Sequence, residues 1–454
     1  MDRYDVFVIG GGGTGSEVAF QLGGRGGIKL GIAERDKLGG ECNHYGCVPT
    51  KVMLRSAKIA AQARDAERFG VRVPSVEVDF LAVRRRVRDV IDSQSGEGAA
   101  PFERLGITVL MDEARLIGPH RVEMADGTQI EADRIVLTTG SEAAVPPIPG
   151  LADGPHWTNK EAIWKPDRVP SSLAVIGTGA IGMEFSQIYA RFGSQVTALE
   201  ILPQILPLED EEAVVSLVPA FEEEGIRLMP GVTVERAEHD GGAWRISLAG
   251  GGHLEVEEVL VAAGRRPVFD VHDLDAAGVK LDTRGRPVLT ETLRTTADHI
   301  WAAGDATGEL LFTHVGSYEA ELVVQDILGS PRARDYRVVP RVTFTDPEVA
   351  SVGLTEAQAR DAGHDVRTGI VRFEDSDRAH IDGRTHGLVK LLADARTGEL
   401  LGGHIVGEEA GAMIHEVVAA MAGRVAPVVV GQAIHAYPTL SEAVRGAFLQ
   451  IQEG

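Results

Sequence analysis

Two stretches of the chain run a short apolar segment directly into closely spaced glycines. They read YDVFVIGGGGTGSE (residues 4–17) and SLAVIGTGAIGME (residues 172–184). In each stretch the apolar run predicts a buried strand, the glycines predict a tight turn, and the following residues predict a helix. The chain therefore repeats one strand, turn and helix unit.

The repeat extends beyond the two glycine turns. Each turn is followed by a second apolar run that ends on an acid, Glu34 in KLGIAERD and Glu200 in QVTALEI. Residues 122–141 and 246–265 then both predict a hairpin with an Asp-Gly or Gly-Gly turn and an apolar strand that closes on a glycine. A lone glycine motif could be a packing turn, but two copies with matching acids and strands indicate one fold used twice.

This pattern predicts a chemical function for the glycines and the acids. Glycines at this spacing let the backbone approach a pyrophosphate at the helix N-terminus, and the acid can hold adenosine ribose hydroxyls. The sequence therefore predicts two dinucleotide sites. A carboxylate at Glu200 would repel a 2′-phosphate, and no Arg follows it in EILPQIL, so we expect NADH rather than NADPH. The glycines concerned are Gly10, Gly12 and Gly15 in the first copy and Gly177, Gly179 and Gly182 in the second.

The rest of the chain has a different organisation. Residues 299–329 predict a strand, a Gly-Asp turn carrying Asp305, and a helix that returns to the first sheet. From about residue 336 the pattern becomes rich in strands (338–354 and 385–407), followed by a helix at 410–424 and a tail at 434–448. This part predicts a separate α+β domain.

Composition and charge exclude several partners. The chain has 454 residues and a formal charge of −22, which repels nucleic acids and anionic lipid surfaces. No stretch approaches a membrane span and no targeting segment is recognisable, so we expect a cytoplasmic location. In that reducing compartment a lone cysteine pair is rarely a structural disulfide.

Both cysteines, Cys42 and Cys47, lie in GGECNHYGCVPTK (residues 39–51). Zinc bound with His44, two unrelated buried thiols and a redox-active disulfide are the alternatives; the zinc reading lacks ligands, and we expect no metal site. In an ideal helix the cysteines would be at least ~7.5 Å apart, beyond the ~6.8 Å limit for bridging. A disulfide therefore needs a distorted segment, for which Gly46 supplies freedom, and Pro49 can start the next helix, whose N-terminus favours a thiolate.

Taken in order, these motifs together with GRRP, GDAT and HAYPTLSEA resemble the flavoprotein disulfide reductases over nearly the whole chain. Within that group the chain is most similar to dihydrolipoamide dehydrogenase and to the related mercuric reductases and soluble transhydrogenases. The resemblance implies an α/β fold with two Rossmann-like domains, for FAD and NAD, and a C-terminal α+β dimerisation domain. The expected limits are 1–150 and 271–335 for the FAD-binding domain, 151–270 for the NAD-binding domain and 336–454 for the dimerisation domain.

The resemblance also implies roles for individual residues. Cys47 matches the thiolate that lies against the flavin and Cys42 the thiol that exchanges with substrate. Lys51 and Glu184 match an ion pair near the reactive edge of the flavin. The positions that match nucleotide contacts are Gly10, Gly12, Gly15, Glu34, Lys51, Ala114, Gly140 and Asp305 for FAD, and Gly177, Gly179, Gly182 and Glu200 for NAD.

By this resemblance, electrons would pass from the nicotinamide to FAD, then to the cysteine disulfide, and then to a small-molecule disulfide. A homodimer is expected, because the C-terminal segment would serve the partner subunit's flavin. A quinone, a metal ion or a second nicotinamide stays open as the acceptor, and so does a non-catalytic flavin-binding subunit.

Two positions depart from the family pattern. Glu41 stands where a small or hydroxylated residue usually faces the FAD pyrophosphate, so we expect its side chain to turn elsewhere. Tyr437 replaces the usual catalytic His before Pro438; with an ordinary pKa of ~10 it is a serviceable acid and a weak base. His435 would share its side if the segment is extended. Glu442 stands at the family's orienting position.

Overall fold

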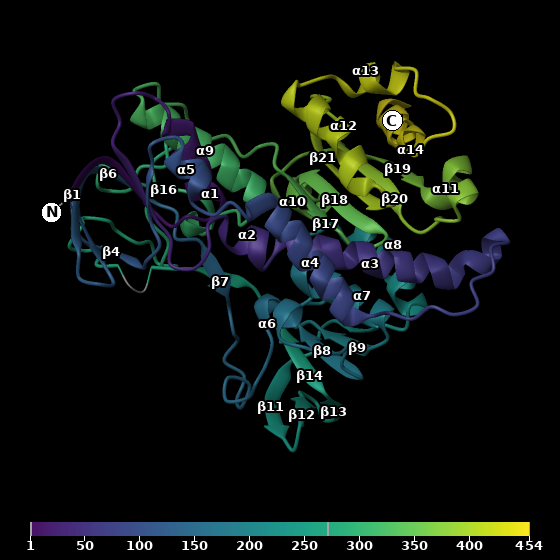
Figure 1. The fold of residues 1–454 in the computed structure, drawn as a ribbon. Coiled ribbons are helices and arrows are strands. Elements are labelled where there is room, and N and C mark those ends of the chain that lie inside the picture. Colours follow the sequence, from purple (N-terminus) through teal and green to yellow (C-terminus); the bar gives the residue numbers. More distant parts are fainter. Residues whose placement is uncertain (1, 270–271, 454) are drawn as a thin grey trace. The chain divides into compact units, whose positions relative to one another are not determined.

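The structure is a computed structural model that describes residues 2–269 and 272–453 (Figure 1). The chain forms two compact units. The first comprises residues 1–52, 84–144 and 265–335, and the second comprises residues 53–83, 145–264 and 336–454. Helices α3 (Cys47–Asp65) and α4 (Phe80–Ser95) contribute residues to both units.

The first unit is built on a seven-stranded sheet. Its strands lie in the order β3, β2, β1, β6, β5, β4, and β16 pairs with β6. The central strand β1 is apolar and buried over its second half, which is why it occupies the middle of the sheet. The bounds are β1 Asp2–Ile9, β2 Leu30–Ala33, β3 Thr108–Leu110, β4 Ala114–Gly118, β5 Arg121–Met124, β6 Gln129–Leu137 and β16 Ile300–Ala302.

Helices of the first unit connect and cover this sheet. The two longer ones, α1 and α9, pack against each other, and both contribute to one buried apolar cluster with β1 and β2. A short ladder pairs β7 with β15. The bounds are α1 Gly13–Leu22, α2 Gly40–His44, α5 Ala100–Glu103, η2 Gly304–Thr307, α9 Thr313–Ile327, β7 Ser141–Ala143 and β15 Arg265–Pro267.

The second unit repeats the nucleotide-binding pattern. Four parallel strands lie in the order β10, β9, β8, β14, and a three-stranded antiparallel sheet, β11 to β13, follows in the chain. The bounds are β8 Ser172–Ile176, β9 Gln195–Leu199, β10 Arg227–Met229, β11 Val234–Asp240, β12 Ala243–Leu248, β13 His253–Val256 and β14 Glu258–Val261, with helices α6 Asn159–Trp164, α7 Ala180–Phe192 and α8 Glu211–Glu223. The predicted strand before each glycine turn and the predicted helix after it are therefore present in both copies.

The C-terminal part of the second unit is an antiparallel sheet with helices. The strand order is β17, β18, β21, β20, β19, and α12 and α14 cover it around a large apolar cluster. The bounds are β17 Pro340–Thr343, β18 Glu348–Gly353, β19 Val366–Arg372, β20 Leu388–Asp394, β21 Leu400–Gly407, α10 Glu356–Asp361, α11 Asp377–Asp382, α12 Ala410–Ala422, α13 Pro427–Gln432 and α14 Ser441–Glu453, with short 3₁₀ turns η1 Ala66–Phe69 and η3 Phe373–Asp375. This is the α+β arrangement that the sequence predicts.

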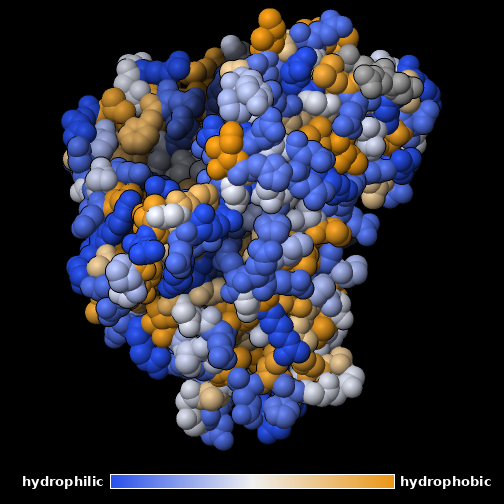
Figure 2. Space-filling view, turned by 90° about the vertical axis from the view of Figure 1, so that its right-hand side faces the viewer, coloured by the Kyte–Doolittle hydropathy of each residue, from blue (hydrophilic) through white to orange (hydrophobic). Residues whose placement is uncertain are grey.

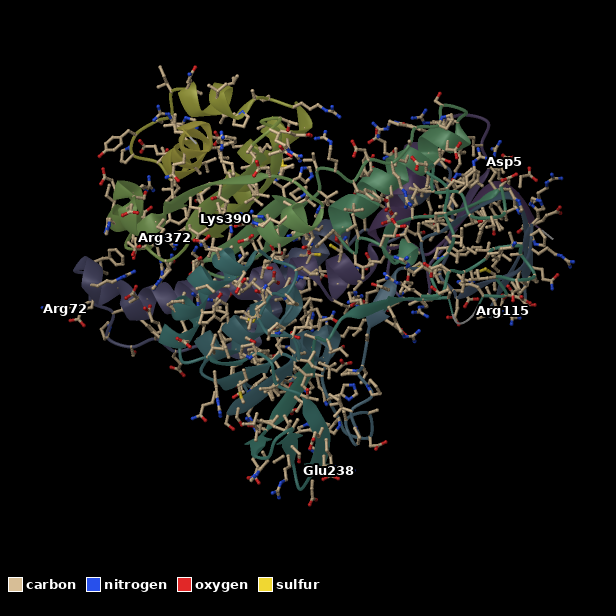
Figure 3. All side chains as sticks on the ribbon, turned by 180° about the vertical axis from the view of Figure 1, so that it is seen from behind. Asp5, Arg72, Arg115, Glu238, Arg372 and Lys390 are labelled. Carbon is tan, nitrogen blue, oxygen red and sulfur yellow. The ribbon has the colours of Figure 1, made fainter. Side chains whose placement is uncertain are left out.

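Buried ion pairs hold the parts of the second unit together. Lys390, in β20 (Figure 3), places Nζ 2.9 Å from Asp210 Oδ1 and 2.7 Å from Glu356 Oε2. Burial would lower the pKa of Lys390, but these carboxylates outweigh it and raise that pKa. Because a buried charge without a partner is costly, this cluster fixes the start of α8 against the sheet.

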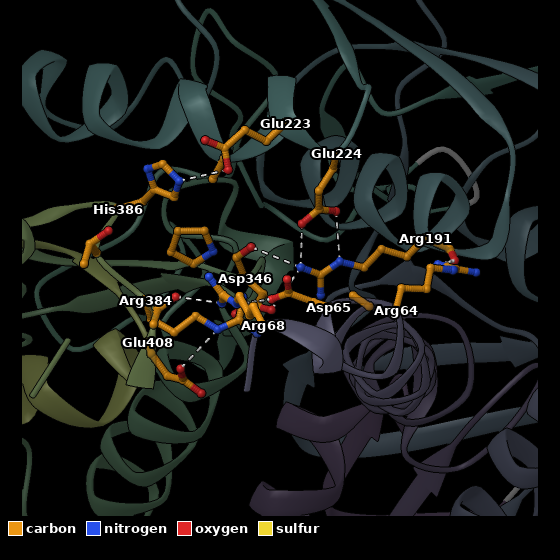
Figure 4. A pocket seen from close by; sticks show the side chains of 15 residues that line it. Arg64, Asp65, Arg68, Arg191, Glu223, Glu224, Asp346, Arg384, His386 and Glu408 are labelled. Carbon is orange, nitrogen blue, oxygen red and sulfur yellow. Dashed lines mark hydrogen bonds and ion pairs between the residues drawn. The ribbon is translucent and has the colours of Figure 1, made fainter. Parts of the chain in front are cut away.

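A cavity of about 500 Å³ in the second unit is lined by charged residues of α3, α7, α8 and three loops (Figure 4). At its base Arg191, whose side chain is 4% exposed, donates to Glu224 through Nε (2.9 Å) and Nη2 (2.6 Å) and to Asp346 Oδ2 (2.9 Å). Burial would raise the pKa of Asp346, but Arg191 and Lys58 outweigh it and lower that pKa. The charges in this cavity are thus largely paired with one another.

The surface agrees with the charged composition. On the face drawn in Figure 2, hydrophilic residues predominate and hydrophobic ones form small separate groups. Within residues 2–269 and 272–453, none of the helices combines the length and the apolar character that crossing a membrane requires.

Candidate redox and dinucleotide sites

The first glycine turn joins β1 to α1 and has the shape of a phosphate cradle. Gly10 has a φ of +106°, and a Cβ on Gly15 would lie 1.9 Å from the Gly10 carbonyl oxygen, so both positions need glycine. Gly12 is the N-cap of α1, and a Cβ built on it would meet no atom within 4 Å, so the side on which a side chain would stand is open. An open N-terminus with exposed backbone N–H groups fits a dinucleotide pyrophosphate.

Glu34 closes this cradle from the end of β2. Its Oε2 accepts the Gly11 N–H (2.8 Å) and its Oε1 accepts the Asp36 N–H (2.8 Å). The carboxylate is therefore fixed beside the turn, and each oxygen keeps a lone pair for a ribose hydroxyl.

Of the other predicted FAD positions in the first unit, the segment that carries Asp305 lies beside the same turn. A Cβ on Gly304 would lie 2.4 Å from Thr14 Oγ1, so η2, which carries Asp305, lies against the start of α1. Gly140, with a φ of +74°, has open space where a side chain would stand. Ala114 begins β4 and is buried.

The second glycine turn, between β8 and α7, repeats the first. Gly177 has a φ of +97°, a Cβ on Gly182 would lie 2.0 Å from the Gly177 carbonyl oxygen, and Gly179 caps α7 with open space around it. Glu200 Oε2 accepts the backbone N–H and the hydroxyl of Thr178 (both 2.9 Å). Its Oε1 accepts the Leu202 N–H (3.0 Å).

The two cysteines lie on either side of a break between helices. Helix α2 ends at His44, Tyr45 leaves the helical region with φ −138° and ψ −3°, and α3 begins at Cys47. The expected distortion is therefore present, but it is at Tyr45. Gly46 has no positive φ and serves by its small size, because a Cβ there would lie 3.2 Å from the Glu41 carbonyl oxygen.

Cys42 and Cys47 are not joined by a disulfide, and their thiols share one hydroxyl group. Thr313 Oγ1, at the start of α9, donates to Cys42 Sγ (3.2 Å) and lies 3.4 Å from Cys47 Sγ. The hydrogen bond to Cys47 and the burial of Cys42 raise the pKa of Cys42. Sequence reasoning did not find Thr313, which lies 271 residues from Cys42 along the chain.

His44 has a structural role. Its Nε2 lies 2.9 Å from the Leu38 carbonyl oxygen, and the ring is largely buried. In the part of the chain that the structure describes, no group of three His, Cys, Asp or Glu residues is arranged to hold a metal ion.

Glu41 is held by Arg265, a contact that the sequence did not reveal. Arg265 Nη1 lies 3.4 Å from Glu41 Oε1, while Nε donates to Ser141 Oγ and Nη2 to the Ser141 carbonyl oxygen (both 2.8 Å). Ser141 Oγ in turn donates to Asp305 Oδ2 (2.5 Å). The unusual acid at position 41 thus has a counter-charge.

In the C-terminal segment His435 and Tyr437 have different partners. His435 Nε2 lies 2.8 Å from Glu416 Oε1 and Nδ1 lies 3.1 Å from the Ala433 carbonyl oxygen. Both partners are hydrogen-bond acceptors. Glu442 accepts the Thr439 N–H (3.2 Å). The carboxylate that contacts His435 is therefore that of Glu416.

Tyr437 is 71% exposed, and its hydroxyl donates to Asp377 Oδ2 (2.9 Å). This hydrogen bond raises the pKa of Tyr437. The side chain is therefore a weaker acid than free tyrosine and holds its proton at neutral pH.

Lys51 belongs to the first unit and Glu184 to the second, so their ion pair stays a prediction. Glu184 is buried in α7, and its Oε1 accepts the Phe344 N–H (3.0 Å).

Two dinucleotide cradles and a dithiol at a helix start define a redox protein of the nucleotide-dependent thiol and disulfide class. Comparison with known proteins gives the family. Residues 4–320 match the family described as pyridine nucleotide-disulphide oxidoreductase, and residues 339–448 match its dimerisation domain. The chain belongs to the pyridine nucleotide-disulphide oxidoreductase family.

Individual relatives support this. The chain is 38% identical to dihydrolipoyl dehydrogenase of Chlorobaculum tepidum, covering 98% of this chain and 96% of the relative. It is 33% identical to mercuric reductase of Bacillus cereus, covering 98% of this chain and 71% of the relative. Among solved structures, the HOCl-induced flavoprotein disulfide reductase RclA from Escherichia coli has a TM-score of 0.88 at 28% identity, covering 98% of this chain and 99% of that one.

The chain is therefore a flavin-dependent disulfide oxidoreductase that uses a pyridine nucleotide. The resemblance and the α/β fold class with a dimerisation domain are confirmed. The family is catalytic, which argues against a non-catalytic flavin-binding subunit.

Proposed function

We propose that this enzyme is a homodimeric, NADH-dependent reductase of a small-molecule disulfide, of dihydrolipoyl dehydrogenase type, with Cys42 and Cys47 as its redox pair. The observation that carries the proposal is that the thiols of Cys42, in α2, and Cys47, at the start of α3, share the hydroxyl of Thr313, at the start of α9. The two thiols are also hydrogen-bonded to each other, which supports a pair that is close enough to form and break a disulfide.

FAD, when bound, would take a hydride from the nicotinamide and pass an electron pair to the Cys42–Cys47 disulfide. The resulting thiolate of Cys42 attacks the substrate disulfide and releases one thiol. Cys47 then attacks the mixed disulfide, which releases the second thiol and reforms the Cys42–Cys47 bond. Per cycle, NADH and one proton are consumed and one substrate disulfide becomes two thiols.

The raised pKa of Cys42 means that disulfide exchange needs both a base and an acid. At neutral pH this thiol keeps its proton, so a base must remove it before exchange and an acid must protonate the leaving thiolate. Tyr437 can act as the acid, and His435 stays the candidate for the base. In the proposed homodimer these residues would come from the partner subunit, which is the usual arrangement in the family that the chain resembles.

The preference for NADH is proposed from the second cradle. Glu200 is buried and is held by Thr178 and Leu202, so its charge is fixed where a 2′-phosphate would stand. A fixed carboxylate accepts two ribose hydroxyls and repels a phosphate.

Other parts of the proposal keep the sequence-based expectations. The domain limits of 1–150 with 271–335, 151–270 and 336–454 and the cytoplasmic location stay predictions. So do the nucleotide-contact roles of the individual residues.

The proposal is tested by steady-state NADH oxidation with lipoamide as acceptor, comparing the wild-type enzyme with Cys42→Ser. We expect turnover in the wild type and its loss in the variant. Rapid reduction of the flavin by NADH should survive in the variant, because the nicotinamide step does not use Cys42. Equal lipoamide turnover in both proteins would reject Cys42 as the exchanging thiol, and no turnover in either would reject lipoamide-type disulfides.

A second candidate is a metal-ion acceptor. Tyr437 in place of the family's usual His favours it, since the mercuric reductases that the chain resembles share this feature; the second cysteine pair of those enzymes is missing, because this chain has two cysteines. Hg(II) and Cu(II) therefore belong in the same assay. Metal-dependent NADH oxidation that exceeds the lipoamide rate and requires Cys42 would favour this candidate.

A further inference from the structure

Glu41 stands beside the glycine turn proposed to receive the FAD pyrophosphate. Gly39 and Gly40 have φ angles of +88° and +59°, and the Gly39 N–H donates to the Gly11 carbonyl oxygen (2.8 Å). A Cβ on Gly40 would lie 2.7 Å from the Gly12 Cα, so the two backbones are in close contact. Because Glu41 follows directly in the first turn of α2, its backbone is held next to Gly12.

A carboxylate in this place opposes the ligand. Both phosphates of FAD are anionic, and a like charge close to them in a partly buried site repels them. We therefore expect an unneutralised carboxylate at position 41 to weaken FAD binding by roughly tenfold. Glu41 therefore needs a neutralising partner if the cradle is to hold FAD.

Arg265 is placed for this purpose. Two of its three nitrogens are fixed by Ser141, at 2.8 Å each, and the third faces Glu41 Oε1 at 3.4 Å. Its Nε also lies 3.8 Å from Asp305 Oδ2. The guanidinium thus lies within reach of two carboxylates of the proposed FAD site.

We infer that Arg265 is the counter-charge that allows the FAD pyrophosphate to bind beside Glu41, so that the requirement for Arg265 depends on Glu41. With a neutral residue at position 41, Arg265 can be lost with little effect on FAD binding. The inference rests on the proposed placement of FAD in the first unit.

The test is the dissociation constant of FAD, measured on the full-length flavin-stripped protein by quenching of flavin fluorescence. Four proteins form a double-mutant cycle: wild type, Arg265→Gln, Glu41→Thr, and the double variant. We expect Arg265→Gln to weaken FAD binding by about tenfold or more, whereas the same change in the Glu41→Thr background costs less than about threefold. Glu41→Thr alone binds FAD at least as tightly as the wild type.

The neighbouring Arg266 provides a matched control. It lies on the same strand, β15, and pairs with Glu142 at the surface. Arg266→Gln removes one positive charge from the same element and should change the FAD dissociation constant by less than about twofold, because an exposed ion pair contributes little.

Several results would overturn the inference. One is an equal loss of FAD affinity on Arg265→Gln with and without Glu41. That result would mean that Arg265 acts through Asp305 or by stabilising its own strand. Another is a double variant that retains no flavin. If Arg265→Gln alone cannot be loaded with FAD and the double variant is loaded normally, the inference is supported. A wild-type chain that binds no FAD would instead reject the placement of FAD on which the inference rests.

Discussion

Thr313→Val tests whether the shared hydroxyl tunes the exchanging thiol. Valine keeps the shape of threonine and removes the group that donates to Cys42 Sγ at 3.2 Å. That hydrogen bond lowers the pKa of Cys42, against the larger effects of Cys47 and of burial, which raise it. Its loss should therefore raise the pKa of Cys42 further.

The magnitude follows from the strength of this hydrogen bond. Hydrogen bonds to charged groups contribute about 1.5–3 kcal/mol, and the exposure of Thr313 puts this one at the lower end. A change of about 1.4 kcal/mol is one pKa unit, so the thiolate fraction of Cys42 should fall about tenfold at any pH below its pKa.

The assay is alkylation of the reduced enzyme by iodoacetamide across a range of pH, with the modified cysteine identified by peptide mass. Because the thiolate is the nucleophile, we expect Cys42 to react about tenfold more slowly in Thr313→Val. Thr313→Ser keeps the hydroxyl and should react as the wild type does. Identical pH profiles for wild type and Thr313→Val would refute the reasoning.

Three further predictions test other parts of the structure. Arg191→Met should lower the free energy of unfolding by about 3–5 kcal/mol in urea titrations, because the carboxylates that Arg191 neutralises would stay in place without a counter-charge. His272, whose pKa is lowered by burial to about 4, accepts the Leu116 N–H through Nδ1 (3.1 Å). Its folded pKa lies below the ordinary value of 6.5, so the stability it contributes is present above pH 6.5 and is lost as the pH falls toward 4, at most about 3 kcal/mol. Glu200→Gln should narrow the preference for NADH over NADPH about tenfold in kcat/KM, because it removes the charge that repels the 2′-phosphate.

Each of these has a control. Arg236→Met removes an arginine from an exposed ion pair with Glu238 and should cost less than about 1 kcal/mol; an equal cost at Arg191 would contradict the buried-pair argument. His272→Asn keeps an acceptor and should flatten the pH dependence of unfolding between 6.5 and 4; an unchanged profile would assign that dependence to other groups. An unchanged cofactor ratio in Glu200→Gln would show that another group selects the nucleotide.

The sequence predicted the parts of the fold that depend on local constraints. Both turns need glycine because a Cβ at Gly15 or Gly182 would collide with the carbonyl oxygen of Gly10 or Gly177. This steric requirement is local, so the same glycine spacing occurs in both copies. A break between the cysteines was expected from helix geometry for the disulfide alternative alone, and its position at Tyr45 was not predicted.

The pairs that complete the sites could not be predicted in this way. Glu41 and Arg265 are 224 residues apart in the chain, and Cys42 and Thr313 are 271 apart. His435 contacts Glu416 on α12, and the Tyr437 hydroxyl donates to Asp377 on α11. Such contacts depend on how distant segments pack, and no local spacing rule in one sequence encodes them.

The carboxylates of Glu34 and Glu200 carry a consequence for how substitutions at these positions are interpreted. Each accepts a hydrogen bond from its own glycine turn, from the N–H of Gly11 in one case and of Thr178 in the other. Replacing either glutamate therefore removes a support of the turn as well as the proposed ribose contact. A loss of nucleotide affinity in such a variant measures both effects together.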